Sequence, residues 1–295
     1  MTAILTTTAP AKVNLDLAVT GRRADGYHLL DSLVVFVDIA DDVTLIAGTG
    51  PALTAEGPFA ALLPADPARN LALRALVALA GAMDRPADAA LHLVKHLPAA
   101  AGLGGGSADA AAVLRLAARV WDARGIDLPA LALSLGADVP VCLKGRPVRM
   151  RGVGEILDPL PCPLPEAWLV LVNPGLPLET APVFRARSGG FSEPPPALPA
   201  RIADAAALAD LLRPRRNDLQ QAAISLCPAI GDVLAAFGRQ PGCLLARMSG
   251  SGASCYGLFA DGGAAEAALG PLRRQGWWAQ GGRMLADLPA ILIPT

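Results

Sequence analysis

The chain has 295 residues, of which 53% are hydrophobic, and its formal net charge at pH 7 is −1. This length predicts two domains, and the hydrophobic fraction argues against a disordered chain. A charge near zero argues against nucleic-acid binding, and no apolar run in the chain reaches membrane-spanning length. We therefore expect a soluble cytoplasmic protein that binds neither nucleic acid nor a membrane.

The chain's five cysteines are dispersed and form no C-x-x-C pair, which is typical of reduced cysteines in a core. The three histidines do not cluster with them, so the sequence predicts no zinc site. His92 and His96 would lie about 13 Å apart on one predicted strand, which is too far for a shared metal ion. We expect both of them to be surface or edge residues.

In the first half of the chain, the pattern of apolar and polar residues predicts a sheet with helices on one side. Residues 11–17 alternate between apolar and polar side chains, which is typical of a strand, and a lysine on its polar face, such as Lys12, is usually solvated. The further predicted elements of this half are strands over 29–39, 42–47 and 90–97, helices over 70–83, 109–121 and 129–135, and turns at 136–140 and 152–154.

The second half begins after a proline-rich stretch, 159–165, which predicts a domain boundary, so that the domains comprise residues 1–158 and 159–295. Strands and helices alternate beyond it without a regular βαβ series, which favours an α+β sandwich over a doubly wound fold. The segment 188–200 predicts a loop or a partly disordered insertion. The predicted strands are 167–172, 243–248, 255–259 and one that starts at 277, and the predicted helices are 218–226, 229–237 and 264–275.

The most informative segment is a glycine-rich run between the predicted strand 90–97 and the helix that follows. Glycines let a backbone approach a phosphate closely, and the first N–H groups of a helix point at it. The run lacks the Gly-Lys-Ser/Thr of a P-loop, and Ser107 stands where the dinucleotide fingerprint requires glycine. A connector or hinge with Ser107 as helix N-cap is the simpler alternative. The candidate phosphate-binding residues are Pro98, Ala99, Ala100, Ala101, Gly102, Leu103, Gly104, Gly105, Gly106, Ser107 and Ala108.

Three other segments carry chemistry-bearing side chains. Lys12 and Asn14 share the polar face of the first strand, and Asp138 lies in the Gly-Ala-Asp-Val-Pro turn, where it is also a good helix N-cap. Residues 248–254 place three serines beside two glycines. A hairpin turn explains those glycines, whereas the hydroxyl and N–H donors suit a phosphate or a substrate.

Together these segments resemble the GHMP kinases over nearly the whole chain. The matching blocks are 9–15, 23–28, 98–107, 136–140 and 247–254. The resemblance implies a two-domain α+β fold with an N-terminal mixed sheet and a C-terminal ferredoxin-like α/β sandwich. The run Asp25-Gly26-Tyr27-His28 resembles the branch of the family whose alcohol substrate carries a cytidine diphosphate.

The resemblance implies that the γ-phosphoryl group of ATP, with Mg²⁺, is transferred to the tertiary 2-hydroxyl of a cytidyl-linked methylerythritol in the non-mevalonate route to isoprenoids. Asp138 would accept the hydroxyl proton, and Lys12 would stabilise the alkoxide as it forms. The glycine-rich run would hold the triphosphate, with Ser107 as a possible Mg²⁺ ligand. The family often has a second serine where this chain has Ala108. One hydroxyl contact to the nucleotide is therefore absent, whereas the backbone groups that would bind the phosphates are unaffected.

On the acceptor side, the resemblance implies that Tyr27 stacks on the cytosine, that His28 reads its polar edge, and that Phe184 forms the opposite wall. Tyr27 and Phe184 would then sandwich the base. The substrate-binding residues implied in this way are Asn14, Tyr27, His28, Thr180, Phe184, Ser249, Gly250, Ser251 and Gly252.

Three rival functions fit parts of the pattern. A homoserine or mevalonate kinase shares the glycine-rich run but would not need the Tyr27-His28 pair. A decarboxylase of the same superfamily also uses ATP, yet no segment of the chain resembles that branch. A nucleotide-binding module without catalysis would not need both Lys12 and Asp138. No interface is marked in the sequence, so a monomer and a homodimer both stay open.

Overall fold

The structure is a computed structural model that describes residues 3–292. Its strands form one sheet, in which seven neighbouring strands follow the order β4-β5-β3-β11-β8-β10-β9. Strands β1, β2 and β6 also pair with β3, and β7 pairs with β6. We call the part of the fold built on β1 to β7 the first lobe and the part built on β8 to β11 the second lobe. The strands of the first lobe are β1 (Ile4–Asn14), β2 (Ala18–Arg22), β3 (His28–Ala47), β4 (Ala52–Glu56), β5 (Ala89–Val94), β6 (Val148–Gly152) and β7 (Ile156–Pro159). Those of the second lobe are β8 (Trp168–Asn173), β9 (Leu245–Met248), β10 (Cys255–Phe259) and β11 (Trp278–Leu285).

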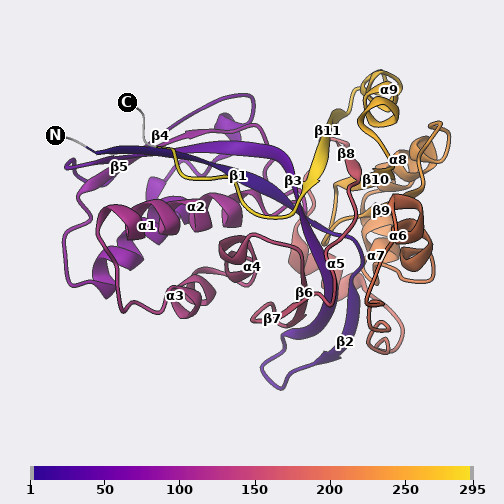
Figure 1. Cartoon of the computed structure of the whole chain (residues 1–295), viewed down its shortest axis with the longest axis horizontal. Helices are drawn as coiled ribbons and strands as arrows, with labels where there is room; N and C mark the ends of the chain where they lie inside the picture. Colours follow the sequence, from indigo (N-terminus) through magenta and orange to yellow (C-terminus); the bar gives the residue numbers. More distant parts are fainter. Residues whose placement is uncertain (1–2, 293–295) are drawn as a thin grey trace.

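Helices cover one face of the sheet in the first lobe, as Figure 1 shows below strands β1, β3 and β5. These helices are α1 (Leu71–Ala82), α2 (Gly105–Val120), α3 (Leu128–Leu135) and α4 (Val139–Lys144), with short 3₁₀ turns at Ala60–Leu62 and Pro67–Arg69. Their buried faces are mostly alanine and leucine, which lets α1 and α2 pack closely on each other and on the sheet. The predicted helices 70–83 and 129–135 are confirmed to within two residues at either end.

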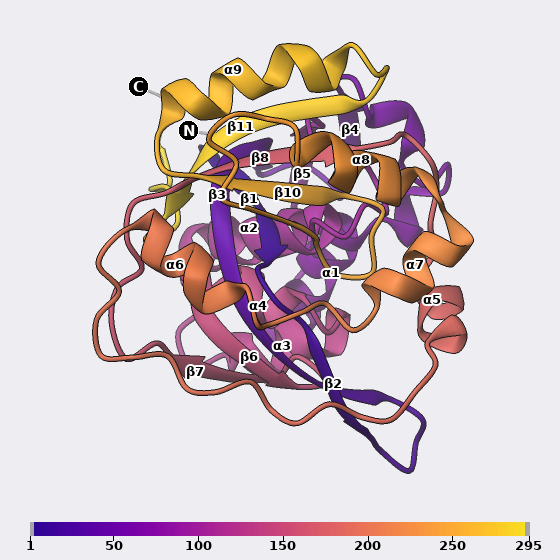
Figure 2. The same ribbon diagram turned by 90° about the vertical axis from the view of Figure 1, so that its right-hand side faces the viewer.

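The second lobe is an antiparallel sheet, β11-β8-β10-β9, with helices packed on it. Figure 2 shows α9 lying along β11 and β8 at one edge of this lobe. Helices α7, α8 and α9 share one apolar core with β8 and β10, and α6 packs into a second core beside it. The helices of this lobe are α5 (Thr180–Ala186), α6 (Ala205–Leu212), α7 (Gln220–Leu226), α8 (Ala229–Phe237) and α9 (Gly262–Arg273).

The last strand joins the two lobes. Met284 and Leu285 of β11 pair with Val37 and Phe36 of β3, while the earlier part of β11 pairs with β8. The C-terminal strand thus packs back on the first lobe, and the sheet runs without a break between them. The boundary at residues 158 and 159 stays a prediction.

Two expectations about local structure are wrong. The stretches 29–39 and 42–47 form one strand, β3, because the Asp41 side chain between them is fully buried and paired instead of marking a turn. Helix α2 begins at Gly105, and its N-cap is Gly104 with a φ of 65°, a left-handed conformation that glycine adopts freely. Ser107 is therefore inside the first turn of α2 and is not the N-cap.

The proline-rich segment 188–200 is a loop, as predicted, and contains no helix or strand. The Ser192 N–H group donates a 2.9 Å hydrogen bond to the carbonyl oxygen of Val19, and Arg149 donates to the carbonyl oxygen of Pro195 at 3.0 Å. These contacts hold the loop against β2 and β6, next to the turn that carries Tyr27.

Candidate active site

A cavity of about 1560 Å³ lies where the two lobes meet, and residues of both lobes line it. The predicted site residues on its wall are Lys12, Asn14, Tyr27, His28, Ala100, Ala101, Gly102, Gly104, Gly105, Gly106, Ser107, Asp138, Thr180, Phe184, Gly250 and Ser251. The predicted residues that are not on its wall are Pro98, Ala99, Leu103, Ala108, Ser249 and Gly252. The structure therefore brings the segments predicted for donor, acceptor and catalysis to one place.

Lys12 and Asp138 form an ion pair on this wall, with 3.0 Å between the lysine Nζ and the aspartate Oδ2. The expected solvation of Lys12 is wrong, since only 3% of the residue is exposed. Asp138 occupies the N-cap position of α4, but its side chain makes no capping hydrogen bond. The carboxylate is instead directed at Lys12 and retains 37% exposure to the cavity.

Asn14 holds the Lys12 side chain in position through a hydrogen bond. The Lys12 ammonium donates a 2.9 Å hydrogen bond to Asn14 Oδ1, and the Asn14 amide nitrogen donates to Ser32 Oγ at 2.7 Å. The Asn14 backbone N–H donates to Ser249 Oγ at 3.1 Å. Asn14 is buried at the cavity wall, and these contacts let it orient Lys12.

The two glycine-containing loops touch through their backbones. Ser249 Oγ donates a 2.9 Å hydrogen bond to the carbonyl oxygen of Gly102, and the Ser254 N–H donates to the carbonyl oxygen of Ala101 at 3.1 Å. A Cβ on Gly102 would lie 2.9 Å from the Gly252 carbonyl oxygen. The loop 248–254 of the second lobe therefore supports the glycine-rich run, which explains why Ser249 and Gly252 lie behind the cavity wall.

The rings of Tyr27, His28 and Phe184 also line the cavity. Phe184 stacks on His28, with ring centroids 4.7 Å apart and planes 21° from parallel, while Tyr27 is 65% exposed. Burial, together with the charges of Arg22 and Arg187, lowers the pKa of His28, which favours a neutral imidazole with one donor and one acceptor nitrogen. The stacking of Tyr27 on a base stays a prediction.

Sequence reasoning missed other residues of the cavity. Arg22, Arg187 and Phe191 line it, and Phe191 belongs to the loop 188–200. The Arg187 guanidinium lies 5.6 Å from the centre of the Phe191 ring, which is 54% exposed. An aromatic residue within a proline-rich polar loop was the one signal in the sequence that pointed to Phe191.

Comparison with known proteins agrees with this geometry. The family described as GHMP kinases N terminal domain matches residues 70–146, and GHMP kinases C terminal matches residues 197–276. The chain is 54% identical over 280 residues to the 4-diphosphocytidyl-2-C-methyl-D-erythritol kinase of Cereibacter sphaeroides strain KD131, covering 94% of this chain and 98% of that one. The chain belongs to this kinase family, within the GHMP kinases. The Rhodospirillum rubrum kinase of the same name is 51% identical, with 96% and 95% covered.

Solved structures confirm the predicted fold of this GHMP kinase. A crystal structure of 4-(cytidine 5'-diphospho)-2C-methyl-D-erythritol kinase superimposes with a TM-score of 0.78 at 36% identity, covering 95% of this chain and 98% of that one. A homoserine kinase from Cytophaga hutchinsonii superimposes with a TM-score of 0.71 at 19% identity, covering 100% and 98%. The second likeness concerns the fold alone.

Three further properties of residues 3–292 of this kinase concern metal binding, membrane crossing and cysteine reactivity. No group of three histidine, cysteine, aspartate or glutamate side chains there could by itself hold a metal ion, and none of the helices there could cross a membrane. All five cysteines are free thiols. Burial raises the pKa of the Cys142 and Cys255 thiols, which keeps both protonated and unreactive.

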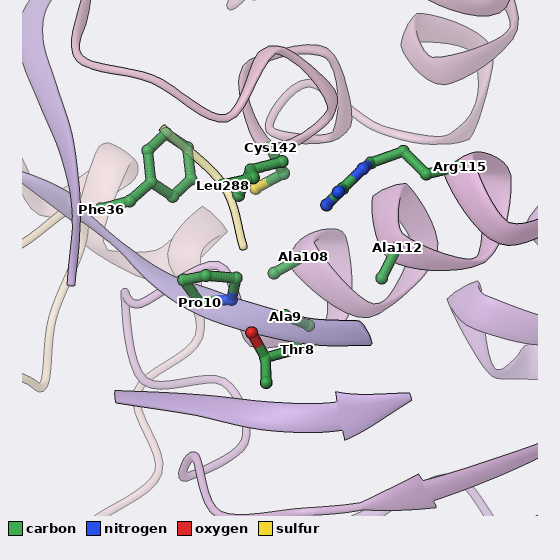
Figure 3. A pocket seen from close by; sticks show the side chains of 9 residues that line it. All are labelled: Thr8, Ala9, Pro10, Phe36, Ala108, Ala112, Arg115, Cys142 and Leu288. Carbon is green, nitrogen blue, oxygen red and sulfur yellow. The ribbon is translucent and has the colours of Figure 1, made fainter. Parts of the chain in front are cut away.

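A second, much smaller cavity lies behind the glycine-rich run, between β1, α2 and α4. Figure 3 shows Ala108 and Arg115 of α2, Cys142 of α4 and Leu288, from the segment after β11, around it. Its volume is about 10 Å³, which is room for no more than one water molecule. The large cavity, in contrast, has room for a substrate.

We expect Gly102→Ala to destabilise this kinase more than Gly48→Ala does. Both glycines have a positive φ, of 72° and 82°, but a Cβ on Gly48 meets no atom within 4 Å. Gly48→Ala therefore isolates the backbone strain of about 1–2 kcal/mol, to which Gly102→Ala adds about 1–3 kcal/mol of overpacking. Denaturant unfolding measures both; equal losses would show that the two loops do not touch as described.

Proposed function

We propose that this chain transfers the γ-phosphoryl group of ATP to the 2-hydroxyl of 4-diphosphocytidyl-2-C-methyl-D-erythritol, in the non-mevalonate route to isoprenoid precursors. Full-length likeness to kinases of that name supports the reaction. The observation that carries the assignment of residues is the ion pair of Lys12 and Asp138, which lies on the same cavity wall as the glycine-rich run and Tyr27.

The donor triphosphate binds at the glycine-rich run in this proposal. Gly104, Gly105 and Gly106 line the cavity without side chains, and α2 begins at Gly105. The first N–H groups of this 16-residue helix lack partners within the helix, so they can donate to phosphate oxygens there. This geometry supports a phosphate-binding role for residues 100–107.

The acceptor hydroxyl lies beside the Lys12–Asp138 pair. Asp138 accepts the hydroxyl proton as the oxygen attacks the γ-phosphorus, and the bond from that phosphorus to the β–γ bridging oxygen breaks, so that ADP leaves. The Lys12 ammonium stabilises the negative charge that develops on the attacking oxygen. Phosphoryl transfer asks the protein for little covalent chemistry, so positioning and charge stabilisation provide most of the rate. Asn14 contributes by holding the lysine in place.

Mg²⁺ fits the oxygen donors on this wall. Ser107 offers a hydroxyl and Asp138 a carboxylate, and Mg²⁺ in kinases is usually held by one or two protein oxygens together with phosphates and water. We assign Ser107 as the protein ligand, with Asp138 nearby. When bound, the ion neutralises phosphate charge.

Both substrates of the proposed reaction are small molecules. We place the reaction in the cytoplasm, where ATP is available. Every residue assigned above belongs to one chain, so a monomer and a homodimer are both compatible with the site.

We expect Tyr27→Ala to raise the KM for the cytidyl alcohol about tenfold, because stacking of one base on an aromatic ring contributes about 1–3 kcal/mol. The KM for ATP should stay within about twofold, since the donor binds at the other end of the cavity. Steady-state kinetics with each substrate varied in turn measures both values. Leu226→Ala, which removes a 47% exposed side chain outside the cavity, is the control. Equal changes in the two KM values would contradict the stacking role.

The proposed reaction is tested by a panel of alcohols. Purified protein is incubated with Mg-ATP and the cytidyl alcohol, homoserine or mevalonate, and ADP release is followed. We expect turnover with the cytidyl alcohol alone. Turnover with homoserine or mevalonate and none with the cytidyl alcohol would overturn the proposed substrate.

A further inference from the structure

Three ionisable side chains are buried together beneath the glycine-rich run, and burial raises the pKa of Asp109 to about 7. The Lys95 ammonium donates to the carboxylates of Asp41, from β3, and Asp109, from α2. Lys95 is 3% exposed, Asp41 is fully buried and Asp109 is 2% exposed. One Asp109 oxygen, Oδ1, finds no hydrogen-bond partner within the described residues. None of these side chains lines the large cavity, so the proposed reaction leaves them without a role.

Stability is a poor explanation for this cluster. Removing charges from water costs several kcal/mol per ion, and apolar side chains of similar size often stabilise a core as well as a buried ion pair does. Two carboxylates share a single lysine here, and one oxygen is left unpaired. A cluster with this much desolvation is more readily explained by the specific geometry that it imposes.

The cluster contacts both ends of the glycine-rich run. Asp41 Oδ1 accepts hydrogen bonds from the backbone N–H groups of His96, at 2.6 Å, and Leu97, at 2.8 Å, immediately before the run begins. At the other end, Asp109 lies one turn into α2, and a Cβ on Gly105 would lie 3.6 Å from Asp41 Oδ2. The backbone therefore leaves the cluster at residue 97 and returns to it at residue 105.

We propose that the Lys95–Asp41–Asp109 cluster positions the glycine-rich run that binds the nucleotide, so that Lys95 is a positioning residue for ATP. The cluster fixes the two ends of the loop relative to each other through one shared ammonium group. A loop held at both ends presents its N–H groups in one arrangement before the nucleotide arrives, which lowers the ordering that binding must otherwise impose. This inference rests on the proposed function insofar as the nucleotide is ATP.

The test is the affinity for Mg-ADP, which calorimetry measures without any acceptor. We expect Lys95→Met to raise the Kd about tenfold or more, since the run must then be ordered when the nucleotide binds. The KM for the cytidyl alcohol should change less, because the cluster makes no hydrogen bond to Tyr27 or His28, the residues proposed to bind the cytosine. Asp109→Asn, which changes the charge and keeps the shape, should raise the Kd about threefold or more.

Arg85→Met is the control for loss of a paired cation away from the glycine-rich run. Arg85 pairs with Asp88 at 2.8 Å and lies 4.5 Å from the Trp121 ring, at the far end of α2, about 24 Å from the loop. We expect this variant to lower the melting temperature and to leave the Kd for Mg-ADP unchanged, which separates positioning from general loss of stability.

A folded Lys95→Met protein that binds Mg-ADP within twofold of the original chain would overturn the proposal. If Lys95→Met does not fold, Asp109→Asn decides by the same comparison. Wild-type protein that binds Mg-ADP tightly but does not phosphorylate the cytidyl alcohol would contradict the proposed function and leave the loop-positioning test in force.

Discussion

Replacing Asp138 by asparagine should lower kcat about 100-fold or more, the lower end of what general-base catalysis contributes. Asparagine keeps the shape of the side chain but cannot accept the hydroxyl proton. The Asp138 carboxylate is 37% exposed and the Lys12 ammonium keeps its hydrogen bond to Asn14, so we expect the variant to stay folded with a modest loss of stability. The KM for ATP should change little, because the loop that holds the donor is intact. Steady-state kinetics and thermal unfolding measure the two effects separately.

Asp158→Asn is the matched control for this variant. Asp158 is 40% exposed and pairs with Arg151 at 2.6 Å, so it resembles Asp138 in exposure and pairing but lies outside the cavity. Its kcat should stay within about twofold of wild type, as for most surface changes away from a site. Near wild-type turnover by Asp138→Asn would remove Asp138 from the reaction.

Lys12→Met should lower kcat about 10²- to 10³-fold, the range found when one preorganised donor to developing charge is removed. Methionine keeps the apolar stem that packs against Gly104, where a Cβ would approach Lys12 Cε to 3.3 Å. The change therefore removes the ammonium group and leaves the loop in place. Asp138 keeps access to water in this variant, so the protein should remain folded.

Lys144, the one exposed lysine of the three in the chain, provides the control for Lys12→Met. Lys144 lies at the end of α4 outside the cavity, and Lys144→Met should leave kcat within about twofold of wild type. The double variant Lys12→Met/Asp138→Asn should be little slower than the slower single variant, because residues that act as a unit are not additive. Fully multiplicative losses would show that the two residues act independently.

The sequence predicted the pieces of the site that depend on local pattern. A glycine-rich run before a helix can be recognised from neighbouring residues alone. Its place beside Lys12 and Asp138 was predicted from the family resemblance. Helix α6 was missed although Asp204 caps it, with its side chain accepting from the Ala207 N–H group at 2.8 Å, in the usual way for an N-cap aspartate. That signal was present in the sequence and was overlooked.

Other features could not be read from local pattern because their partners are distant in the chain. Lys95 and Asp41 are 54 residues apart in the chain, so their buried contact cannot be predicted from neighbouring residues. His28 and Phe184 stack across the lobes, a contact that local pattern does not predict. In both cases the topology of β3 and α5 decides the contact, and residue type alone does not.

The most direct test of the proposed reaction is to determine which oxygen of the product carries the new phosphate. Wild-type protein is incubated with Mg-ATP and 4-diphosphocytidyl-2-C-methyl-D-erythritol, and the product is examined by phosphorus and carbon NMR, with Asp138→Asn in parallel. The account predicts one ADP for each phosphate ester formed on the 2-hydroxyl, and a strong loss of this product in the variant. Release of inorganic phosphate without the ester, or a phosphate on another oxygen, would contradict it.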